Sequence, residues 1–96
     1  MIRGGWTYIM TNKPRGTFYV GVTADLAARI SQHRTGIGAA FCRRYNLDRL
    51  VLVEEHSTIE EAIAREKALK AWRREWTIEL IEKSNPGWHD LAEHLV

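Results

Sequence analysis

Two short segments near the start of the chain are rich in aromatic and β-branched residues. They cover residues 6–10 and 17–22, and this composition is typical of strands. The residues between them include Asn12, Pro14 and Gly16, which favour a turn. The sequence therefore predicts an antiparallel hairpin.

The alternation of side chains along a strand predicts which hairpin residues share a face. Trp6, Tyr8 and Met10 lie on one face of the first strand. Tyr19 and Gly21 lie on one face of the second strand. If the register permits, we expect both tyrosines to project from the same side of the sheet.

A helical pattern follows the hairpin. Either Thr23 or Asp25 can cap the start of this helix. We expect it to end near Gly36, because Thr35-Gly36-Ile37-Gly38 supplies a break. A short helical segment over residues 39–45 follows. The apolar positions of the first helix include Leu26, Ala27 and Ile30.

The second half of the chain predicts one strand and a further helix. Residues 50–55 are a run of valine and leucine that ends in charge, which indicates a third strand. Ser57 and Glu60 have the spacing of a capping box, so we expect the next helix to begin there. The apolar stripe of that helix is expected to contain Ile59, Ala62, Ile63 and Leu69.

A second helix, or a bent extension of the previous one, is predicted over residues 72–82. Asn85-Pro86-Gly87 should end it. Trp88 is then expected to pack back on the domain, before a C-terminal tail over residues 92–96. The residues of this helix that we expect to face inward are Trp76, Leu80 and Ile81.

The order of these elements is strand, strand, helix, short helix, strand, helix, helix. It predicts an α+β domain in which helices flank a small three-stranded antiparallel sheet. A chain of 96 residues has the length of one domain, so we expect a single domain over residues 1–96 with its core at about 6–91.

The composition favours a reducing compartment and gives no sign of a membrane-spanning segment. Cys42 is the only cysteine, so it cannot form an internal disulfide and fits a small buried apolar residue in a reducing compartment. No apolar run reaches the roughly 18 residues of a membrane span, and the first residues do not resemble a secretory signal. We therefore expect a cytoplasmic protein without a membrane partner.

The charge of the chain is weak support for any partner, because the net charge is only +2 and the pI is about 8.9. Positive residues nevertheless concentrate in two short regions. They form either a solvated helix face or a contact for nucleic acid. The residues that would contact nucleic acid are Arg43, Arg44, Lys67, Lys70 and Arg74.

Glu66 is the anomaly of the second half, because it falls in the middle of an apolar helical stripe. Burying a carboxylate costs on the order of several kcal/mol unless it is paired or binds a metal. Two interpretations remain open. Glu66 either forms a structural ion pair, for example with Arg29, or serves as a metal ligand.

Five side chains together suit metal-assisted hydrolysis of a phosphodiester. Arginine binds phosphate oxygens, and a lone carboxylate suits magnesium, which keeps several waters. A phenol can hold or deprotonate water if nearby cations lower its pKa. The sequence contains no zinc, P-loop or dinucleotide motif, so no nucleotide cofactor is expected. The five residues are Tyr8, Tyr19, Arg29, His33 and Glu66.

These residues resemble the signature of the GIY-YIG nuclease superfamily. Its two triplets correspond to Trp6-Thr7-Tyr8 and Tyr19-Val20-Gly21, with the tyrosines eleven residues apart. Arg29 and His33 stand where members carry a helix arginine and a histidine, and Glu66 stands where they carry a metal-binding glutamate. From Trp6 to about Leu91, the chain is similar to small stand-alone bacterial GIY-YIG domain proteins.

The resemblance implies an endonuclease that hydrolyses DNA phosphodiester bonds with Mg²⁺ or Mn²⁺. In this role Tyr8 is the general base or positions the water, and His33 accepts or relays its proton. Tyr19 orients the water or the phosphate, and Arg29 neutralises charge on the phosphate. Glu66 holds the metal ion. DNA, including branched or single-stranded forms, is the implied partner, with a structure-selective role in repair or recombination.

Some residues depart from the family pattern. Trp6 and Thr7 replace the usual glycine and isoleucine of the first triplet, and Val22 excludes a base mechanism that depends on lysine there. Asn85 is a candidate for the family asparagine, but it also fits a cap of the following turn.

Each candidate also has a purely structural interpretation. The two tyrosines fit half-buried sheet aromatics, and His33 fits an exposed helix residue. Tyr45 and the four tryptophans fit the core or its edge better than base-stacking platforms. The alternative functions are a nucleic-acid-binding module with little or no catalysis and, third, a protein-interaction domain.

Overall fold

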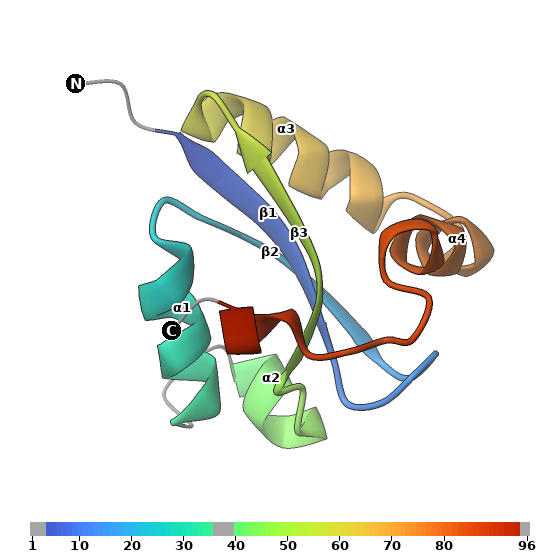
Figure 1. The fold of residues 1–96 in the computed structure, drawn as a ribbon. Coiled ribbons are helices and arrows are strands. Elements are labelled where there is room, and N and C mark those ends of the chain that lie inside the picture. The colour runs from blue at the N-terminus through green and yellow to red at the C-terminus, as the bar shows by residue number, and fades with distance from the viewer. Residues whose placement is uncertain (1–3, 36–39, 95–96) are drawn as a thin grey trace.

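A computed structural model describes residues 4–35 and 40–94. Three strands form one antiparallel sheet in the order β2-β1-β3, and helices cover both of its faces (Figure 1). The predicted α+β class and the order of the elements are confirmed. The strands are β1 (Gly5–Thr11), β2 (Phe18–Thr23) and β3 (Arg49–His56). The helices are α1 (Leu26–Arg34), α2 (Ala40–Tyr45), α3 (Ile59–Lys70), α4 (Arg74–Ser84) and the short 3₁₀ helix η1 (Leu91–His94).

The two faces of the sheet carry different helices. α1, α2 and η1 lie on one side of the sheet, and α3 and α4 lie on the other (Figure 1). A β-bulge at Ile9/Met10 leaves Val51 of β3 without a partner in β1. Consecutive strand residues normally face opposite sides of a sheet, but the bulge allows Val51 and the next residue, Leu52, to pack in the same core. Leu50 packs in the cluster that contains Tyr8 and Met10, whereas Val51 packs in the cluster that contains Ile9.

The register of the hairpin confirms the shared face of the two tyrosines. Tyr8 pairs with Gly21, and Met10 pairs with Tyr19. Directly paired residues of an antiparallel sheet project from the same face. Tyr8 and Tyr19 therefore both lie on the side of the sheet that α1 and α2 cover.

The first helix is capped by Asp25, one of the two predicted residues. The Asp25 side chain accepts a hydrogen bond from the backbone N–H of Ala28 at 3.1 Å. Leu26 and Ile30 are buried as expected, but Ala27 is exposed because it lies on the solvent side of the helix. α1 ends at Arg34, and most of the predicted break, residues 36–38, lies outside the described residues, as does residue 39.

The predicted capping box at Ser57 and Glu60 is wrong by one residue. Thr58 and Glu61 form it instead, each side chain bonding the other's backbone N–H. Both pairs have the same spacing, and β3 continues through His56, so the helix begins one residue later than expected. Ile63 is also not part of the buried stripe, since 37% of it is exposed.

The orientation of α4 differs from the prediction. The chain turns between α3 and α4, and the helical periodicity starts again at Arg74. Thr77 and Ile81, four residues apart, are therefore the buried positions. Trp76, predicted to face inward, turns away and is 48% exposed. Tyr45, predicted at the core or its edge, is 42% exposed.

The predictions for Asn85, Trp88 and Cys42 agree with the structure. Asn85 is buried and caps the turn, because its amide group bonds the backbone N–H and carbonyl of His89 and the carbonyl of Val51. Trp88 is buried. Cys42 is buried too, and this burial raises the pKa of its thiol to about 11. Among the described residues, no helix is both long and apolar enough to cross a membrane.

Candidate active site

Tyr8, Tyr19 and His33 come together on the α1 side of the sheet. The ring centroid of Tyr8 lies 6.4 Å from that of Tyr19 and 5.9 Å from that of His33. Tyr19 and His33 are 5.8 Å apart. The Tyr8 hydroxyl lies 3.1 Å from Nε2 of His33. Residues from β1, β2 and α1 therefore form one contiguous cluster, and His33 is buried rather than exposed.

Gly21 allows this cluster to form. Tyr8 lies across the backbone of its partner in β2, so a Cβ atom on residue 21 would lie 2.5 Å from the Tyr8 hydroxyl oxygen and 2.9 Å from Cε2 of Tyr19. Real Cβ atoms essentially never approach so closely. The glycine of the second triplet is thus required by close packing against a tyrosine, a role that the sequence did not reveal.

The protonation states in the cluster follow from burial. Burial raises the pKa of Tyr8 well above its ordinary value, and nearby Tyr19 raises it further. Arg29 acts in the opposite direction but is outweighed, so cations do not lower the pKa of this phenol in the structure. Burial, followed by the charge of Arg29, lowers the pKa of His33. A neutral His33 can accept the Tyr8 proton at Nε2.

Arg29 lies on α1, one turn before His33, and is half-buried. Its charge lowers the pKa of Tyr8, Tyr19 and His33 alike, so Arg29 lies near enough to act on all three side chains. Within residues 4–35 and 40–94, no salt bridge joins Arg29 to Glu66. The ion pair suggested with Arg29 is therefore absent from this part of the chain, and Arg29 can meet an anionic ligand, whereas Glu66 pairs with Lys70 instead.

Glu66 lies on α3, on the opposite face of the sheet, but its charge raises the pKa of both Tyr8 and Tyr19. The Glu66 side chain is only 15% exposed and forms a salt bridge of 2.8 Å with Lys70, one helical turn away. Arg29 and Glu66 therefore both act on the two phenols, although neither contacts the other.

A metal ion at Glu66 would have few protein ligands. The described residues contain no group of three or more His, Cys, Asp or Glu side chains placed to hold a metal. This arrangement does not fit zinc, which takes three or four protein ligands. It fits magnesium or manganese, which can take one carboxylate and complete their shell with water and phosphate oxygens.

The residues predicted to contact nucleic acid differ in whether their side chains already make contacts within the protein. Arg43 and Arg44 are exposed on α2, and Lys67 and Lys70 are exposed on α3. Arg74 instead donates hydrogen bonds to the carbonyls of Arg15 and Gly16, and its guanidinium lies 4.4 Å from the centre of the Phe18 ring. Arg74 therefore has a structural role in holding the hairpin turn.

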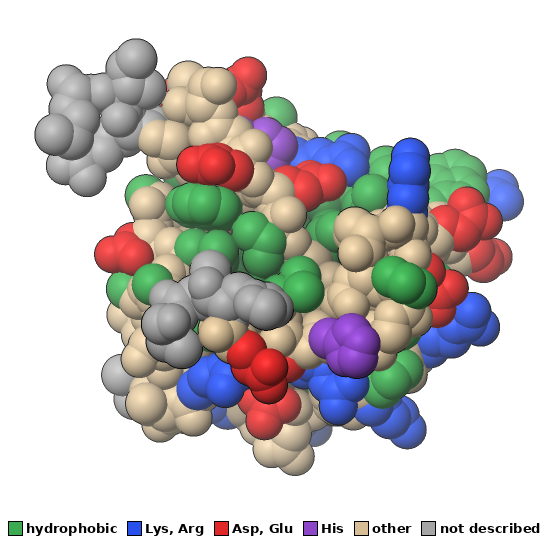
Figure 2. Space-filling view, viewed as in Figure 1, with side chains coloured by type: hydrophobic (Ala, Val, Ile, Leu, Met, Phe, Trp, Pro, Cys, Tyr) green, Lys and Arg blue, Asp and Glu red, His purple; other side chains and the backbone are tan. Residues whose placement is uncertain are grey.

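Charges of both signs are mixed on the face of the molecule seen in Figure 2, and no continuous basic surface covers it. Any electrostatic contact with nucleic acid on this face is therefore local. Lys70 is a positive group that acts locally: burial raises the pKa of Tyr19, and the charge of nearby Lys70 acts in the opposite direction.

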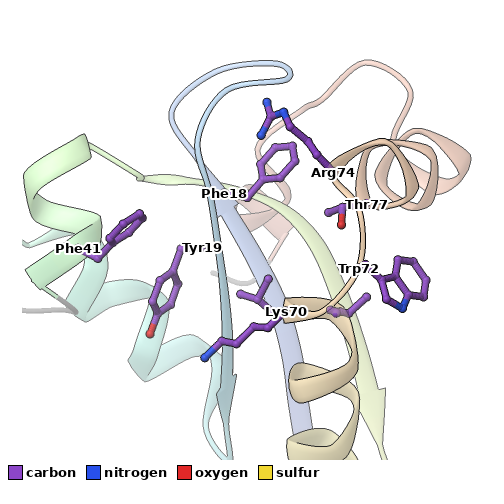
Figure 3. A pocket seen from close by; sticks show the side chains of 9 residues that line it. Phe18, Tyr19, Phe41, Lys70, Trp72, Arg74 and Thr77 are labelled. Carbon is purple, nitrogen blue, oxygen red and sulfur yellow. The ribbon is translucent and has the colours of Figure 1, made fainter.

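A groove with a volume of about 470 Å³ opens beside Tyr19 (Figure 3). Phe41 of α2 and Trp72 contribute to its lining, together with Lys70 at the end of α3. Phe41 was not among the residues predicted from the sequence to belong to a site. Its four-residue spacing from Tyr45, on a short helix with Arg43 and Arg44, was the signal that could have identified an exposed aromatic surface.

The chain is similar to proteins of one family along most of its length. The family model described as the GIY-YIG catalytic domain matches residues 4–79. A UPF0213 protein of Staphylococcus epidermidis is 31% identical over 68 residues, and one of Staphylococcus aureus is 32% identical over 68 residues. In both cases the matched region covers 71% of this chain and 83% of the relative.

A solved structure shares the fold as well. The solution NMR structure of a UPF0213 protein from Bacillus halodurans has a TM-score of 0.58 and 29% sequence identity. The similarity covers 91% of this chain and 92% of that protein. The resemblance between the two folds thus extends beyond residue 79, where the matched family domain ends.

Proposed function

Because the chain belongs to the GIY-YIG family, a family of endonucleases, we propose that it is an endonuclease that hydrolyses DNA phosphodiester bonds. The observation that carries the proposal is the bond between the Tyr8 hydroxyl and Nε2 of His33, with Arg29 beside it. A neutral phenol bonded to a neutral imidazole forms a ready path for a proton.

In this mechanism a water attacks the scissile phosphate as Tyr8 and His33 relay its proton. Tyr8 takes the proton from the water and passes its own hydroxyl proton to Nε2 of His33. The relay avoids a free phenolate, which burial disfavours at this position. Nδ1 of His33 has no partner among the described residues, and a cavity of about 310 Å³ lined by His33 offers the proton an exit.

Arg29 and Tyr19 bind and orient the reacting phosphate. The guanidinium of Arg29 can bind two phosphate oxygens and stabilise the negative charge that develops as the bond breaks. The Tyr19 ring packs beside Tyr8 and His33, which supports a role for its hydroxyl in hydrogen-bonding the water or a phosphate oxygen. Both residues hold the substrate near the relay.

Glu66 is the residue proposed to bind Mg²⁺ or Mn²⁺. A bound ion would stabilise the charge on the leaving 3′ oxygen. The Glu66 carboxylate would then bind the ion instead of Lys70. The Lys70 ammonium would be left free to contact DNA. Lys70 is 54% exposed at its side chain, so this exchange needs no rearrangement of the core.

The proposal is tested by incubating purified protein with DNA and Mg²⁺ or Mn²⁺. We expect cleavage that EDTA and Glu66→Ala both abolish. Glu60→Ala, which removes an exposed carboxylate from the same helix, is the matched control and should cleave normally. Cleavage that persists in purified Glu66→Ala protein would show that the site assignment is wrong.

The preferred form of DNA belongs to the same proposal. We propose selection by DNA structure rather than by base sequence, in repair or recombination, since the exposed arginines and lysines suit phosphates better than base edges. A panel of labelled duplex, single-stranded, flap and branched DNA tests this selection. Equal cutting of every form, or cutting at one base sequence only, would contradict it.

The Glu66–Lys70 salt bridge favours a second candidate function, a nucleic-acid-binding module with little or no catalysis. In that case the Glu66 carboxylate stabilises α3 through its salt bridge with Lys70 and binds no ion. The expected result is binding of nucleic acid that weakens steeply as salt is added, without cleavage of any substrate form. Failure to bind nucleic acid at any salt concentration would favour a protein-interaction domain instead.

A further inference from the structure

We propose that the groove beside Tyr19 binds an unpaired nucleobase, and that Phe41 is the ring on which this base stacks. The inference rests on the proposed function for the class of ligand, a DNA strand. It adds that the strand next to the cleaved bond must be single-stranded or locally unpaired.

The groove crosses the outer edge of β2 (Figure 3). Tyr19 and Phe41 lie on one side of this edge, and Phe18, Trp72 and Arg74 lie on the other. Its volume of about 470 Å³ is within the range of small-molecule sites, roughly 300–1,000 Å³. Since Tyr19 belongs both to the groove and to the cluster with Tyr8, an occupant of the groove lies beside the proposed reaction centre.

The aromatic rings of the groove differ in how much of their surface is already covered. Phe18 stacks on Trp88 with 5.8 Å between ring centroids, and Arg74 lies over the Phe18 ring as well. The guanidinium of Arg65 lies 5.0 Å from the centre of the Trp72 ring, so Trp72 is partly covered too. Both rings therefore serve mainly in packing.

Phe41 is the ring of the groove that remains accessible. It is 44% exposed, stacks against Tyr19 at 6.3 Å with an angle of 29° between the ring planes, and touches Tyr45 at 4.8 Å. Exposed aromatic surface is costly in water and commonly marks a binding site. A flat ligand can extend this short stack of rings by lying on Phe41.

Positive residues lie on the helix that carries the accessible ring and at the end of α3. Arg43 and Arg44 are exposed on the same helix, and neither forms a salt bridge within residues 4–35 and 40–94. Lys70 lines the groove from the end of α3. Cations beside an aromatic platform match a polymer in which planar bases alternate with anionic phosphates.

This pattern selects an unpaired strand over a continuous duplex. In a duplex each base face is covered by its neighbours, and only the phosphates and base edges reach a protein. The groove offers few groups to read base edges, because aromatic and aliphatic side chains dominate its lining. An unpaired base can place its face on Phe41 while its phosphates meet the cations of α2.

The test measures binding in EDTA, so that no cleavage is needed. The probe is a fluorescein-labelled oligothymidylate, compared by anisotropy with a blunt duplex of the same length. We expect the single strand to bind more tightly. Phe41→Ala should weaken its binding by about tenfold and leave duplex binding nearly unchanged, in line with the loss of one base–aromatic stack.

Three further variants separate stacking from other effects. Phe41→Leu keeps an apolar side chain without a ring and should bind as weakly as Phe41→Ala. Phe41→Tyr restores the ring and should restore binding. Trp76→Ala removes an equally exposed aromatic residue outside the groove and should bind normally, with all variants checked for folding by circular dichroism.

The outcomes that overturn the inference are distinct from those that overturn the proposed function. Equal or tighter binding of the duplex, normal binding by Phe41→Ala or Phe41→Leu, or equal weakening by Trp76→Ala would each contradict the base subsite. If the single strand binds through Phe41 but no DNA is cut with Mg²⁺ or Mn²⁺, the base subsite stands and the nuclease proposal fails.

Discussion

The position of Tyr8 depends on one glycine in the neighbouring strand. Gly21 has no side chain, so the Tyr8 ring can cross its backbone and reach His33. The two family triplets are thus parts of one packing arrangement, in which the tyrosine of the first needs the glycine of the second. This relation connects a backbone requirement directly with the proposed proton relay.

Gly21→Ala should therefore disturb both stability and activity. The new methyl group displaces Tyr8 or Tyr19, and we expect a loss of about 1–3 kcal/mol in the free energy of unfolding. A shift of about 1 Å in a catalytic group can reduce the rate by about 100-fold. Urea denaturation and cleavage rates measure the two effects.

The matched control for this change is Gly87→Ala. The three atoms nearest to a Cβ at residue 87 all belong to the ring of His89, an exposed side chain that can rotate away. We expect this variant to keep its stability and its cleavage rate. Similar losses in both variants would mean that the contact between Gly21 and Tyr8 has no special role.

His33 should make both activity and stability depend on pH. Burial and Arg29 lower its pKa in the folded protein below the ordinary value of 6.5, so the unfolded chain takes up the proton first as the pH falls. The stability contributed by the neutral ring is complete above pH 6.5 and is lost as the pH falls through the folded pKa. The rate of cleavage should fall over the same range, because a protonated imidazole cannot accept the Tyr8 proton.

Urea denaturation over a series of pH values tests this prediction. His33→Gln should remove the part of the pH dependence that belongs to His33, and His89→Gln, at an exposed position, should leave the dependence unchanged. An identical pH profile for the wild-type protein and His33→Gln would contradict the prediction.

Among the helices, α3 shows that a local sequence signal can predict a helix without identifying the residue at which the helix begins. Two pairs of residues have capping-box spacing, and the pairing of β3 with β1 decides that Thr58 and Glu61 form the box. The start of α3 matters for function because the same helix carries Glu66 and Lys70 towards the β2 edge. A shift of one residue would rotate Glu66 by about 100° around the helix axis.

Thr58→Ala should therefore destabilise the domain by about 1 kcal/mol, the usual effect of losing an N-cap side chain. Ser57→Ala, one residue earlier, should change the free energy of unfolding by less than about 0.5 kcal/mol. Urea denaturation of both variants is the measurement. A larger loss for Ser57→Ala would indicate that α3 begins at the earlier pair.

The fold as a whole is closed by the segment that follows α4. Trp88 donates a hydrogen bond from Nε1 to Glu82 at 2.7 Å, and its backbone carbonyl accepts one from Arg49 at 3.0 Å. The Asp90 carboxylate accepts hydrogen bonds from the backbone N–H of Leu50 and from Arg34. The segment thus joins α4, β3 and α1, although the family model matches only residues 4–79.

Trp88→Ala should be among the most destabilising substitutions in the chain. Loss of a buried tryptophan typically costs about 3–5 kcal/mol, a large part of the roughly 5–15 kcal/mol that stabilises a domain. Trp76→Ala removes a tryptophan that is 48% exposed and should cost far less. Comparable thermal unfolding temperatures for the two variants would contradict this view of the closing segment.

The sequence by itself determined the hairpin and the element order. It predicted a shared face for the two tyrosines on the condition that the register permits it, and the pairing of β1 with β2 supplies that register. These features depend on local composition and on the alternation of side chains along a strand, which are readable along the chain. The spacings of Tyr8, Tyr19, Arg29, His33 and Glu66 also pointed to the family to which the chain belongs. Local composition was enough for the hairpin because its two strands and their turn are adjacent in the chain.

Only the tertiary structure decided how these elements meet. The exposure of Trp76 depends on the turn before α4, and the neutral state of the Tyr8–His33 pair depends on burial by other elements. The accessible ring of Phe41 depends likewise on how α2 is placed beside β2. Contacts between segments far apart in the chain leave no periodic signal in the sequence, so packing alone could reveal them.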